Sequence, residues 1–238
     1  MAKILVAGLV FLHGSGDSGK GAETFLSQQG GGLFTRRMEE AGVRTVYPDA
    51  PAVPYSLMRG RPLPVWFDRV AMAYDAPEDA KGIARSVRQI DSEIDALVAL
   101  GIPLSRIAVA GFSMGGCLAL HVGYGAGKYS HKLAAVAAMS TFLSKDSQLD
   151  AALKAAEGTP APPLFLAHGK ADGMIDPKWA KATRDRLQAA GVDVPPEIRF
   201  FEGLDHYMCK EELEQLADFL LEHLAGASCK TSPCVGKK

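Results

Sequence analysis

The sequence predicts an α/β domain in which helices cover both faces of a central, mostly parallel β-sheet. Three observations predict it. Six short apolar runs recur along the chain, helical patterns separate them, and the length of 238 residues suits one large domain. Strands joined by helical crossovers pair in parallel and are buried on both faces. We expect this domain to span residues 1–224 and residues 225–238 to form a disordered tail.

The expected strands are runs of apolar residues without strict polar alternation, which is the pattern of strands buried on both faces. The first of them contains the run ILVAGLVFL, and the third reads RIAVAG. The six expected strands occupy residues 4–12, 43–47, 106–111, 133–139, 164–168 and 197–201.

The expected helices fill the intervals between the strands. The clearest is 77–100, where Ile83, Val87, Ile90 and Ile94 follow one another at steps of three or four, and Gly101 ends it. Helix 177–190 begins with Pro177 in the first turn after Asp176 as its cap. The other expected helices are 22–41, interrupted by glycines at 30–32, and 114–123, 146–156 and 210–224.

The segment 49–68, DAPAVPYSLMRGRPLPVWFD, breaks the alternation of strands and helices. It is rich in proline and too long for a simple connection. We expect a long loop here, and loops of this length inside a compact domain often serve function.

Composition excludes several classes of protein. The net charge of −1 gives no basic surplus, so we expect no nucleic-acid partner. No run approaches the roughly 18 apolar residues of a membrane span, so at most peripheral membrane contact is expected. Lys3 and the apolar run after it resemble a leader peptide, but no small-residue cleavage site follows. We therefore expect a cytoplasmic protein.

The four cysteines have no paired CxxC spacing, so the sequence predicts no metal site. Cys117 lies in an apolar helical segment and is expected to be a buried thiol. Cys229 and Cys234 lie in the polar tail and are expected to be free thiols.

Residues 13–21, HGSGDSGKG, follow the first strand and allow two interpretations. Gly14 to Lys20 fit the G-x-x-x-x-G-K spacing of a phosphate-binding loop. However, Gly21 stands where such a loop carries the Ser or Thr that holds magnesium. In the other interpretation, the glycine-rich backbone turns N–H groups toward a developing oxyanion.

The stretch GFSMG at residues 111–115 has the pattern G-x-S-x-G, with an apolar strand before it and a helical pattern after it. This is the context of a nucleophile elbow, in which a serine stands on a sharp strand-to-helix turn. We therefore expect Ser113 to be a catalytic nucleophile.

A serine nucleophile needs a histidine base and an acid. His206 follows the last expected strand through a short loop and precedes the last helix, where the chain order serine, acid, histidine puts the base. Asp172 follows the fifth strand and is the preferred acid. Asp176 is the alternative, although it is better explained as a helix cap, and Asp205 is too close to His206 in the chain to reach its Nδ1.

Several motifs together resemble those of the acyl-protein thioesterase and lysophospholipase group, the phospholipase/carboxylesterase family of α/β-hydrolases. The resemblance covers about residues 9–224. Within the group, the segments around residues 13, 58 and 113 are most similar to the lysophospholipase-like protein 1 branch. The motifs are HGSGDSG, YPDAP, WFDR, GFSMGG, HGKAD and FEGLDH, in this order.

The resemblance implies the α/β-hydrolase fold and a catalytic triad of Ser113, Asp172 and His206. It also implies an oxyanion hole formed by the backbone N–H groups of Ser15 and Met114. Trp66 is a candidate for the substrate pocket, although it can equally anchor the long loop as a half-buried aromatic.

The expected activity is hydrolysis of carboxylic esters or thioesters through an acyl-enzyme, with no cofactor. The substrates would be acylated small molecules or S-acylated proteins. Ser15 and Met114 stand where the better-known thioesterases of the group usually have Leu and Gln, which favours short acyl chains. A long-chain palmitoyl-protein thioesterase or lysophospholipase is the alternative, and a lipase, a peptidase or a non-catalytic binding module on the same fold are more distant ones.

Overall fold

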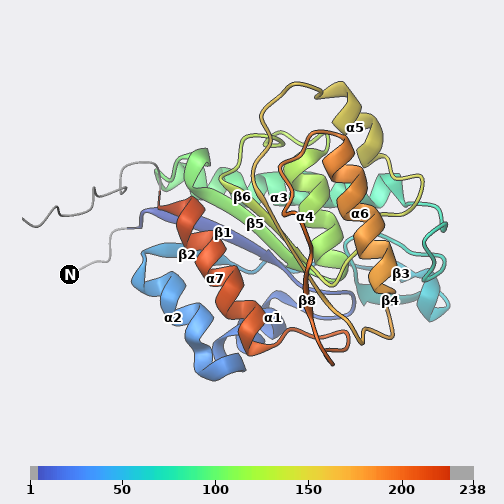
Figure 1. The fold of residues 1–238 in the computed structure, drawn as a ribbon, viewed down its shortest axis with the longest axis horizontal. Coiled ribbons are helices and arrows are strands. Elements are labelled where there is room, and N and C mark those ends of the chain that lie inside the picture. Colours follow the sequence, from blue (N-terminus) through green and yellow to red (C-terminus); the bar gives the residue numbers. More distant parts are fainter. Residues whose placement is uncertain (1–4, 226–238) are drawn as a thin grey trace, which may run out of the picture.

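The computed structural model describes residues 5–225 and contains a six-stranded sheet in which every pairing is parallel (Figure 1). All six expected strands are confirmed, with ends that differ by up to three residues. In spatial order they are β2 (Val43–Val46), β1 (Ala7–Leu12), β5 (Ile107–Phe112), β6 (Ala135–Met139), β7 (Leu164–Gly169) and β8 (Arg199–Phe201).

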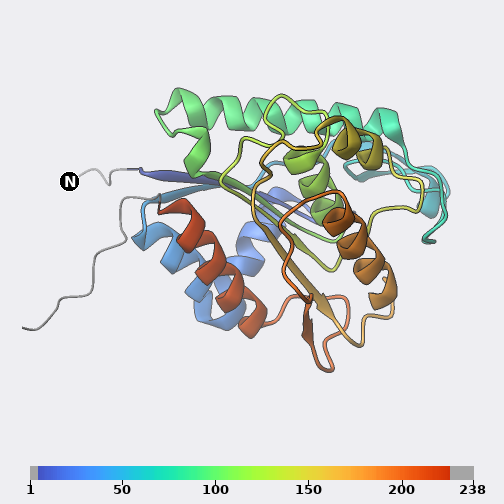
Figure 2. The same cartoon turned by 45° about the horizontal axis from the view of Figure 1, so that its top comes forward.

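Helices cover both faces of this sheet, as Figure 2 shows, so the expected fold class is confirmed. One face is covered by α1 (Gly19–Gln28), α2 (Leu33–Glu40) and α7 (Lys210–Leu224). The other face is covered by α3 (Ala80–Ala99), α4 (Met114–Tyr124), α5 (Leu149–Ala155) and α6 (Pro177–Ala189).

Strand β1 illustrates why its residues are apolar on both sides. Val10 and Leu12 pack into the core beneath α3 and α4, whereas Leu9 and Phe11 pack into the core beneath α1, α2 and α7. Successive side chains of a strand point to opposite faces, so a strand in the middle of a sandwiched sheet needs apolar residues at every position.

The three glycines at 30–32 separate α1 from α2, as expected. Their φ angles are 56°, 69° and 71°, a left-handed conformation that favours glycine. The chain therefore turns between two helices here, and the expected segment 22–41 is two helices rather than one.

The segment 49–68 is not the loop that the sequence predicts. It contains an antiparallel hairpin of β3 (Ala52–Tyr55) and β4 (Arg61–Pro64), separate from the main sheet. The prolines of this segment argue against strands in the sequence, because the central strands of a sheet exclude proline. In a two-stranded sheet both strands are edge strands, where proline is tolerated.

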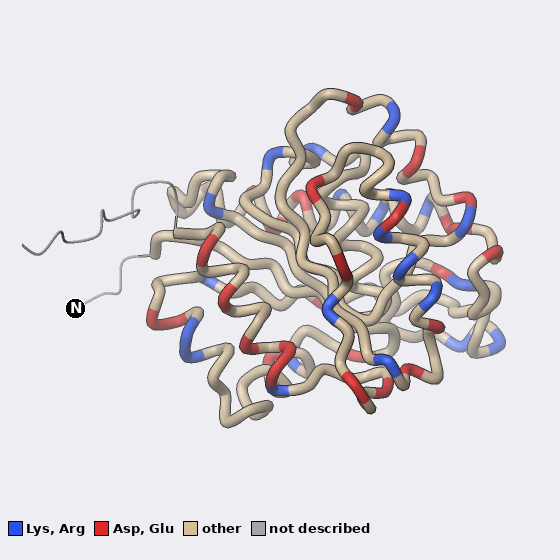
Figure 3. The backbone as a smooth tube through the Cα atoms, in the orientation of Figure 1, with Lys and Arg blue, Asp and Glu red and all other residues tan. Residues whose placement is uncertain are grey.

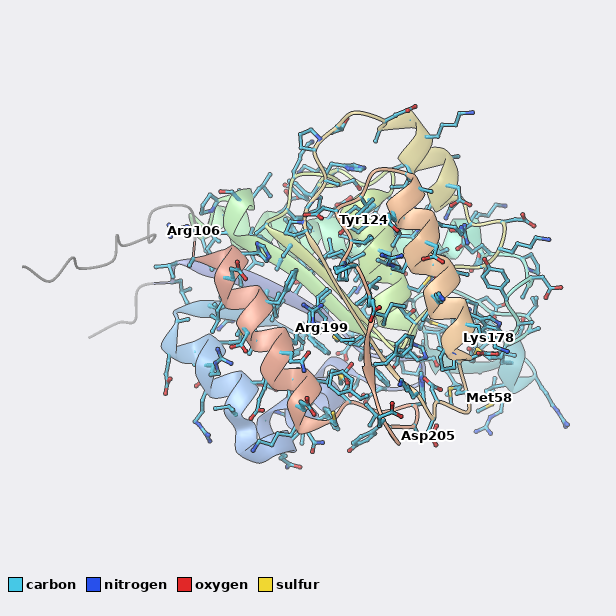
Figure 4. The ribbon with its side chains drawn as sticks, viewed as in Figure 1. Met58, Arg106, Tyr124, Lys178, Arg199 and Asp205 are labelled. Carbon is cyan, nitrogen blue, oxygen red and sulfur yellow. The ribbon has the colours of Figure 1, made fainter. Side chains whose placement is uncertain are left out.

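The spatial order of the strands reverses between β1 and β5. From β1 the chain passes to β2 on one side, and from β5 it passes to β6 on the other. Ligands of open α/β sheets bind at such a switch point, outside the carboxyl ends of the strands. In Figure 4, Arg106, which precedes β5, and Asp205, which follows β8, lie at opposite ends of the sheet, and the site described below is at the Asp205 end.

Lysines and arginines alternate with acidic residues over the described backbone (Figure 3).

None of the helices within residues 5–225 has the length and apolar character needed to cross a bilayer. Cys117 and Cys209 carry free thiols. The expected tail, with Cys229 and Cys234, lies outside the described residues except for Ala225.

Candidate active site

Ser113 stands on the turn between β5 and α4, at the switch point of the sheet. Its φ of 57° and ψ of −121° lie in a strained region for a residue with a side chain. The Ser113 N–H donates to the Met139 carbonyl at the end of β6, 2.9 Å away, which holds the turn against the neighbouring strand. This is the backbone geometry of a nucleophile elbow.

The two glycines of the G-x-S-x-G pattern are required by close approach of the backbone. A Cβ atom at Gly111 would lie 2.3 Å from the Gly115 carbonyl carbon, and one at Gly115 would lie 2.2 Å from the Leu12 carbonyl oxygen. Without side chains at these positions, α4 begins directly against the ends of β1 and β5. The sharp turn at Ser113 therefore depends on both glycines.

Ser113, His206 and Asp172 form one hydrogen-bonded chain. The Ser113 Oγ lies 2.9 Å from His206 Nε2, and His206 Nδ1 lies 2.8 Å from Asp172 Oδ2. The three residues follow β5, β8 and β7 respectively, so parallel strands bring them to one edge of the sheet. The order and the distances are those of a nucleophile, a base and an orienting acid.

The Asp172 carboxylate is buried but well supplied with hydrogen bonds. Its Oδ1 accepts from the N–H groups of Met174 and Ile175 at 2.9 and 2.8 Å. Burial raises the pKa of this carboxyl, but the hydrogen bonds to His168, His206 and the Ile175 N–H outweigh burial and hold it well below its usual value. Asp172 therefore remains ionised beside His206.

The sequence did not single out His168 as a partner of the acid. This fully buried residue is the second-to-last residue of β7, and its Nε2 lies 3.2 Å from Asp172 Oδ2 and 3.0 Å from the Ile175 carbonyl. The sequence contains a signal for this role, because His168 lies at the carboxyl end of a strand, four residues before Asp172.

The two other acidic candidates have different roles. Asp176 caps α6 by accepting from the Lys178 N–H at 2.9 Å, as expected from the proline that follows it. Asp205 Oδ1 accepts from the N–H groups of Gly173 and His206, at 2.9 and 2.8 Å. Asp205 therefore joins the loop that carries the acid to the loop that carries the histidine.

The loop after β1 lies directly against the nucleophile. A Cβ atom at Gly14 would be 3.4 Å from Ser113 Cβ, so the next peptide N–H, that of Ser15, is near the Ser113 side chain. Met114 is the first residue of α4, and the N–H groups in the first turn of a helix have no acceptor within the helix. Within residues 5–225, neither the Ser15 nor the Met114 N–H donates to a protein acceptor.

His13 fixes the orientation of this loop. Its Nδ1 is 2.7 Å from the Gly14 carbonyl oxygen, and its Nε2 accepts from the Ala50 N–H at 3.0 Å. Burial lowers the pKa of His13, which favours the neutral ring, with Nδ1–H as donor and Nε2 as acceptor. Because the Gly14 carbonyl and the Ser15 N–H share one rigid peptide plane, holding the carbonyl also orients the N–H.

Trp66 is an anchor in this structure rather than a lining of the substrate pocket. Its side chain is fully buried, which leaves no surface for a substrate, and its Nε1 donates to the His13 carbonyl at 2.9 Å. The Gly16 N–H donates to the Pro64 carbonyl at 2.8 Å. The hairpin segment therefore holds the loop after β1 through several hydrogen bonds.

The phosphate-loop interpretation of residues 14–20 loses support from the same loop. The Gly19 N–H donates to Asp49 Oδ1 at 2.7 Å, and the Gly21 N–H donates to the Ser18 hydroxyl at 3.0 Å. Two amides that a phosphate would need are therefore occupied, one of them by a carboxylate that would repel an anion.

Comparison with known proteins identifies the family of this chain. The family model described as Phospholipase/Carboxylesterase matches residues 5–224. Mouse lysophospholipase-like protein 1 is 36% identical over 221 residues, which cover 92% of this chain and 88% of that protein. Acyl-protein thioesterase 1 of Neurospora crassa is 34% identical over 236 residues, which cover 94% of this chain and 90% of that protein.

Solved structures agree with the fold. Acyl-protein thioesterase 2 from Zea mays superposes with a TM-score of 0.76 at 27% identity, and the alignment covers 94% of this chain and 96% of that one. SOBER1 from Arabidopsis thaliana has a TM-score of 0.76 at 24% identity, with 92% and 99% covered. The expected family resemblance is confirmed: this chain belongs to the Phospholipase/Carboxylesterase family of α/β-hydrolases and is a hydrolase of ester or thioester bonds.

Proposed function

We propose that the protein cleaves short-chain carboxylic esters and thioesters with Ser113 as the nucleophile, His206 as the base and Asp172 as the orienting acid. The observation that carries the proposal is the unbroken hydrogen-bonded chain from the Ser113 hydroxyl through His206 to the ionised Asp172. The names of the relatives, a lysophospholipase-like protein and an acyl-protein thioesterase, support the class of reaction.

In the first step, His206 Nε2 accepts the Ser113 proton while Oγ forms a bond to the carbonyl carbon of the substrate. The carbonyl electrons move to the oxygen, and the N–H groups of Ser15 and Met114 stabilise the resulting oxyanion. The tetrahedral intermediate then expels the alcohol or thiol, which takes the proton from His206. Ser113 remains acylated.

In the second step, water attacks the acyl-enzyme with His206 again as base. The carboxylic acid leaves, the proton returns to Ser113, and the enzyme is restored. Asp172 keeps the His206 ring in the tautomer whose Nε2 can accept a proton, and it stabilises the imidazolium that forms in each step. All the groups that the reaction needs are protein groups and water.

The preference for short acyl chains rests on polar groups beside the proposed oxyanion hole. Ser15 carries an exposed hydroxyl in the loop after β1, and the segment packed against that loop adds the buried polar side chains of Tyr55 and Arg69. A long alkyl chain passing here would desolvate these groups without giving them partners. Small esters and S-acylated protein cysteines with short acyl groups are the proposed substrates.

The test is a series of p-nitrophenyl esters from acetate to palmitate and the matching acyl thioesters, measured as kcat/KM. Ser113→Ala should abolish turnover, whereas Ser92→Ala, a control on the exposed face of α3, should not change it. Activity that peaks at short chains supports the proposal. A peak at long chains overturns the chain-length preference, and hydrolysis that survives in Ser113→Ala overturns the assignment of the nucleophile.

A further inference from the structure

Three side chains that take no part in the hydrogen-bonded chain of Ser113, His206 and Asp172 meet beside α4, and two of them come from α4 itself. Cys117 and His121 lie one turn apart on α4 and therefore on the same face of that helix, and Glu78 comes from the segment before α3. One ligand atom from each residue lies within 4.8 Å of the other two. The three residue types, a thiol, an imidazole and a carboxylate, are the usual protein ligands of zinc.

Two of these ligand atoms face each other without a hydrogen bond. His121 Nε2 lies 3.4 Å from Glu78 Oε1, the two side chains are only 3% and 6% exposed, and neither atom has a hydrogen-bond partner within the described chain. Leaving buried polar atoms without partners is costly. The two atoms form an ion pair when His121 is protonated; when the ring is neutral, a metal ion bonded to both atoms would satisfy them.

The separation of the two atoms fits a shared metal ion. Two ligands bonded to a tetrahedral zinc ion at about 2.0–2.2 Å lie about 3.4 Å apart. The other oxygen of the same carboxylate, Glu78 Oε2, accepts from the Gln148 N–H at 3.0 Å. This contact orients the carboxylate so that Oε1 faces His121, as outer contacts do in metal sites.

A cavity of about 370 Å³ borders the His121 side of this cluster. The cavity is also lined by the polar residues Asp91, Lys128 and Gln148. It is large enough for water to bind as the fourth ligand, which completes tetrahedral coordination of an ion that has three protein ligands.

We propose that Glu78, Cys117 and His121 bind one Zn²⁺ ion, separate from the catalytic chain. The ion would join α4, the helix that begins at the nucleophile, to the segment that leads into α3. Binding would release to solvent the Cys117 thiol proton and any proton on His121 Nε2, since thiolate and neutral imidazole are the ligand forms. Local sequence patterns do not predict the site, because its ligands have no CxxC spacing and come from two distant segments.

The test uses the full chain, stripped with a chelator and dialysed against Zn²⁺ or Co²⁺. Wild type should bind one zinc ion per chain, counted by mass spectrometry of the metal, and bound cobalt should show thiolate-to-metal charge-transfer absorption. Cys117→Ala should lose that absorption and bind zinc more than about tenfold more weakly, and His121→Gln and Glu78→Gln should also weaken binding. Zinc should raise the melting temperature of wild type but not of Cys117→Ala.

Matched controls separate this site from other thiols. Cys209→Ser and the double variant Cys229→Ser, Cys234→Ser should retain both the zinc ion and the cobalt absorption. Circular dichroism shows whether each variant is folded, and the Gln variants test the site if Cys117→Ala does not fold. The proposal is overturned if wild type binds no zinc at micromolar concentrations, or if binding is lost in the double variant and kept in Cys117→Ala.

Discussion

A single carboxylate oxygen of Asp172, Oδ2, is shared by two histidines: His206 Nδ1 lies 2.8 Å from it and His168 Nε2 lies 3.2 Å from it. His206 continues to the Ser113 hydroxyl, whereas His168 is fully buried and faces no substrate. We infer that His168 acts through Asp172, by holding this carboxylate in the position and the charge state that the proposed base His206 needs.

Replacing His168 with Phe should lower kcat by about tenfold with little change in KM. The reason is that a hydrogen bond to a charged group contributes about 1.5–3 kcal/mol, and about 1.4 kcal/mol corresponds to a factor of ten. Steady-state kinetics on a short ester measures the effect. His168→Gln, whose amide N–H can replace the Nε2–H donor, is the matched control and should retain most of the activity; equal losses in both variants would contradict the positioning role.

Asp172→Asn should lower kcat, whereas Asp176→Ala should lower only the stability of the fold. The asparagine keeps an acceptor for the N–H groups of Met174 and Ile175 but cannot hold the His206 tautomer, so kcat should fall by about 10³–10⁴. The alanine removes only the cap of α6, which should cost about 1 kcal/mol of stability and leave kcat unchanged. Kinetics and urea unfolding of both variants measure these effects, and a large loss of kcat in Asp176→Ala would reverse the choice of acid.

Trp66→Phe should lower kcat by about tenfold, because the loop after β1 loses the Nε1–H donor that holds the His13 carbonyl. The control is Tyr124→Phe, at the far end of α4 from Ser113, which also removes a buried donor to a backbone carbonyl, that of Pro162. Both variants should be less stable by about 1 kcal/mol, since each leaves a carbonyl without its donor. If the two variants lose kcat equally, the effect is one of general stability.

Glu212 should make the protein less stable as the pH rises. Its carboxyl is fully buried in α7, neither oxygen has a hydrogen-bond partner within the described chain, and burial raises its pKa from 4.5 to about 8. Below pH 4.5 both states are protonated; between pH 4.5 and 8 only the unfolded state ionises, so stability falls by up to about 1.4 kcal/mol per pH unit.

The Glu212→Gln variant should remove this dependence and be more stable than wild type at pH 8 but not at pH 4.5. Urea unfolding at the two pH values measures it, with the exposed neighbour variant Glu211→Gln as control. A gain of the same size at both pH values would show that ionisation of Glu212 is not the cause.

Local sequence patterns are enough to predict the layers of the fold and to single out Ser113 as the proposed nucleophile. Apolar runs that alternate with amphipathic helices require a parallel sheet covered on both faces, whatever their exact ends. Ser113 was identified because the elbow is local: its strand, two glycines and helix are consecutive in the chain. The cap at Asp176 was identified for the same reason.

Other features depend on contacts between segments that are distant in the chain, and these could be seen only in the folded structure. The two strands at 52–55 and 61–64 form because each pairs with the other in a separate two-stranded sheet, where both strands are edge strands and prolines are tolerated. Trp66 is an anchor because the loop of His13 packs against it, 53 residues away in the chain. The second histidine at Asp172 and the cluster of Glu78, Cys117 and His121 likewise arise from packing. Local patterns encode the backbone's own preferences, whereas which side chains meet is fixed only when the strands pair and the helices pack onto the sheet.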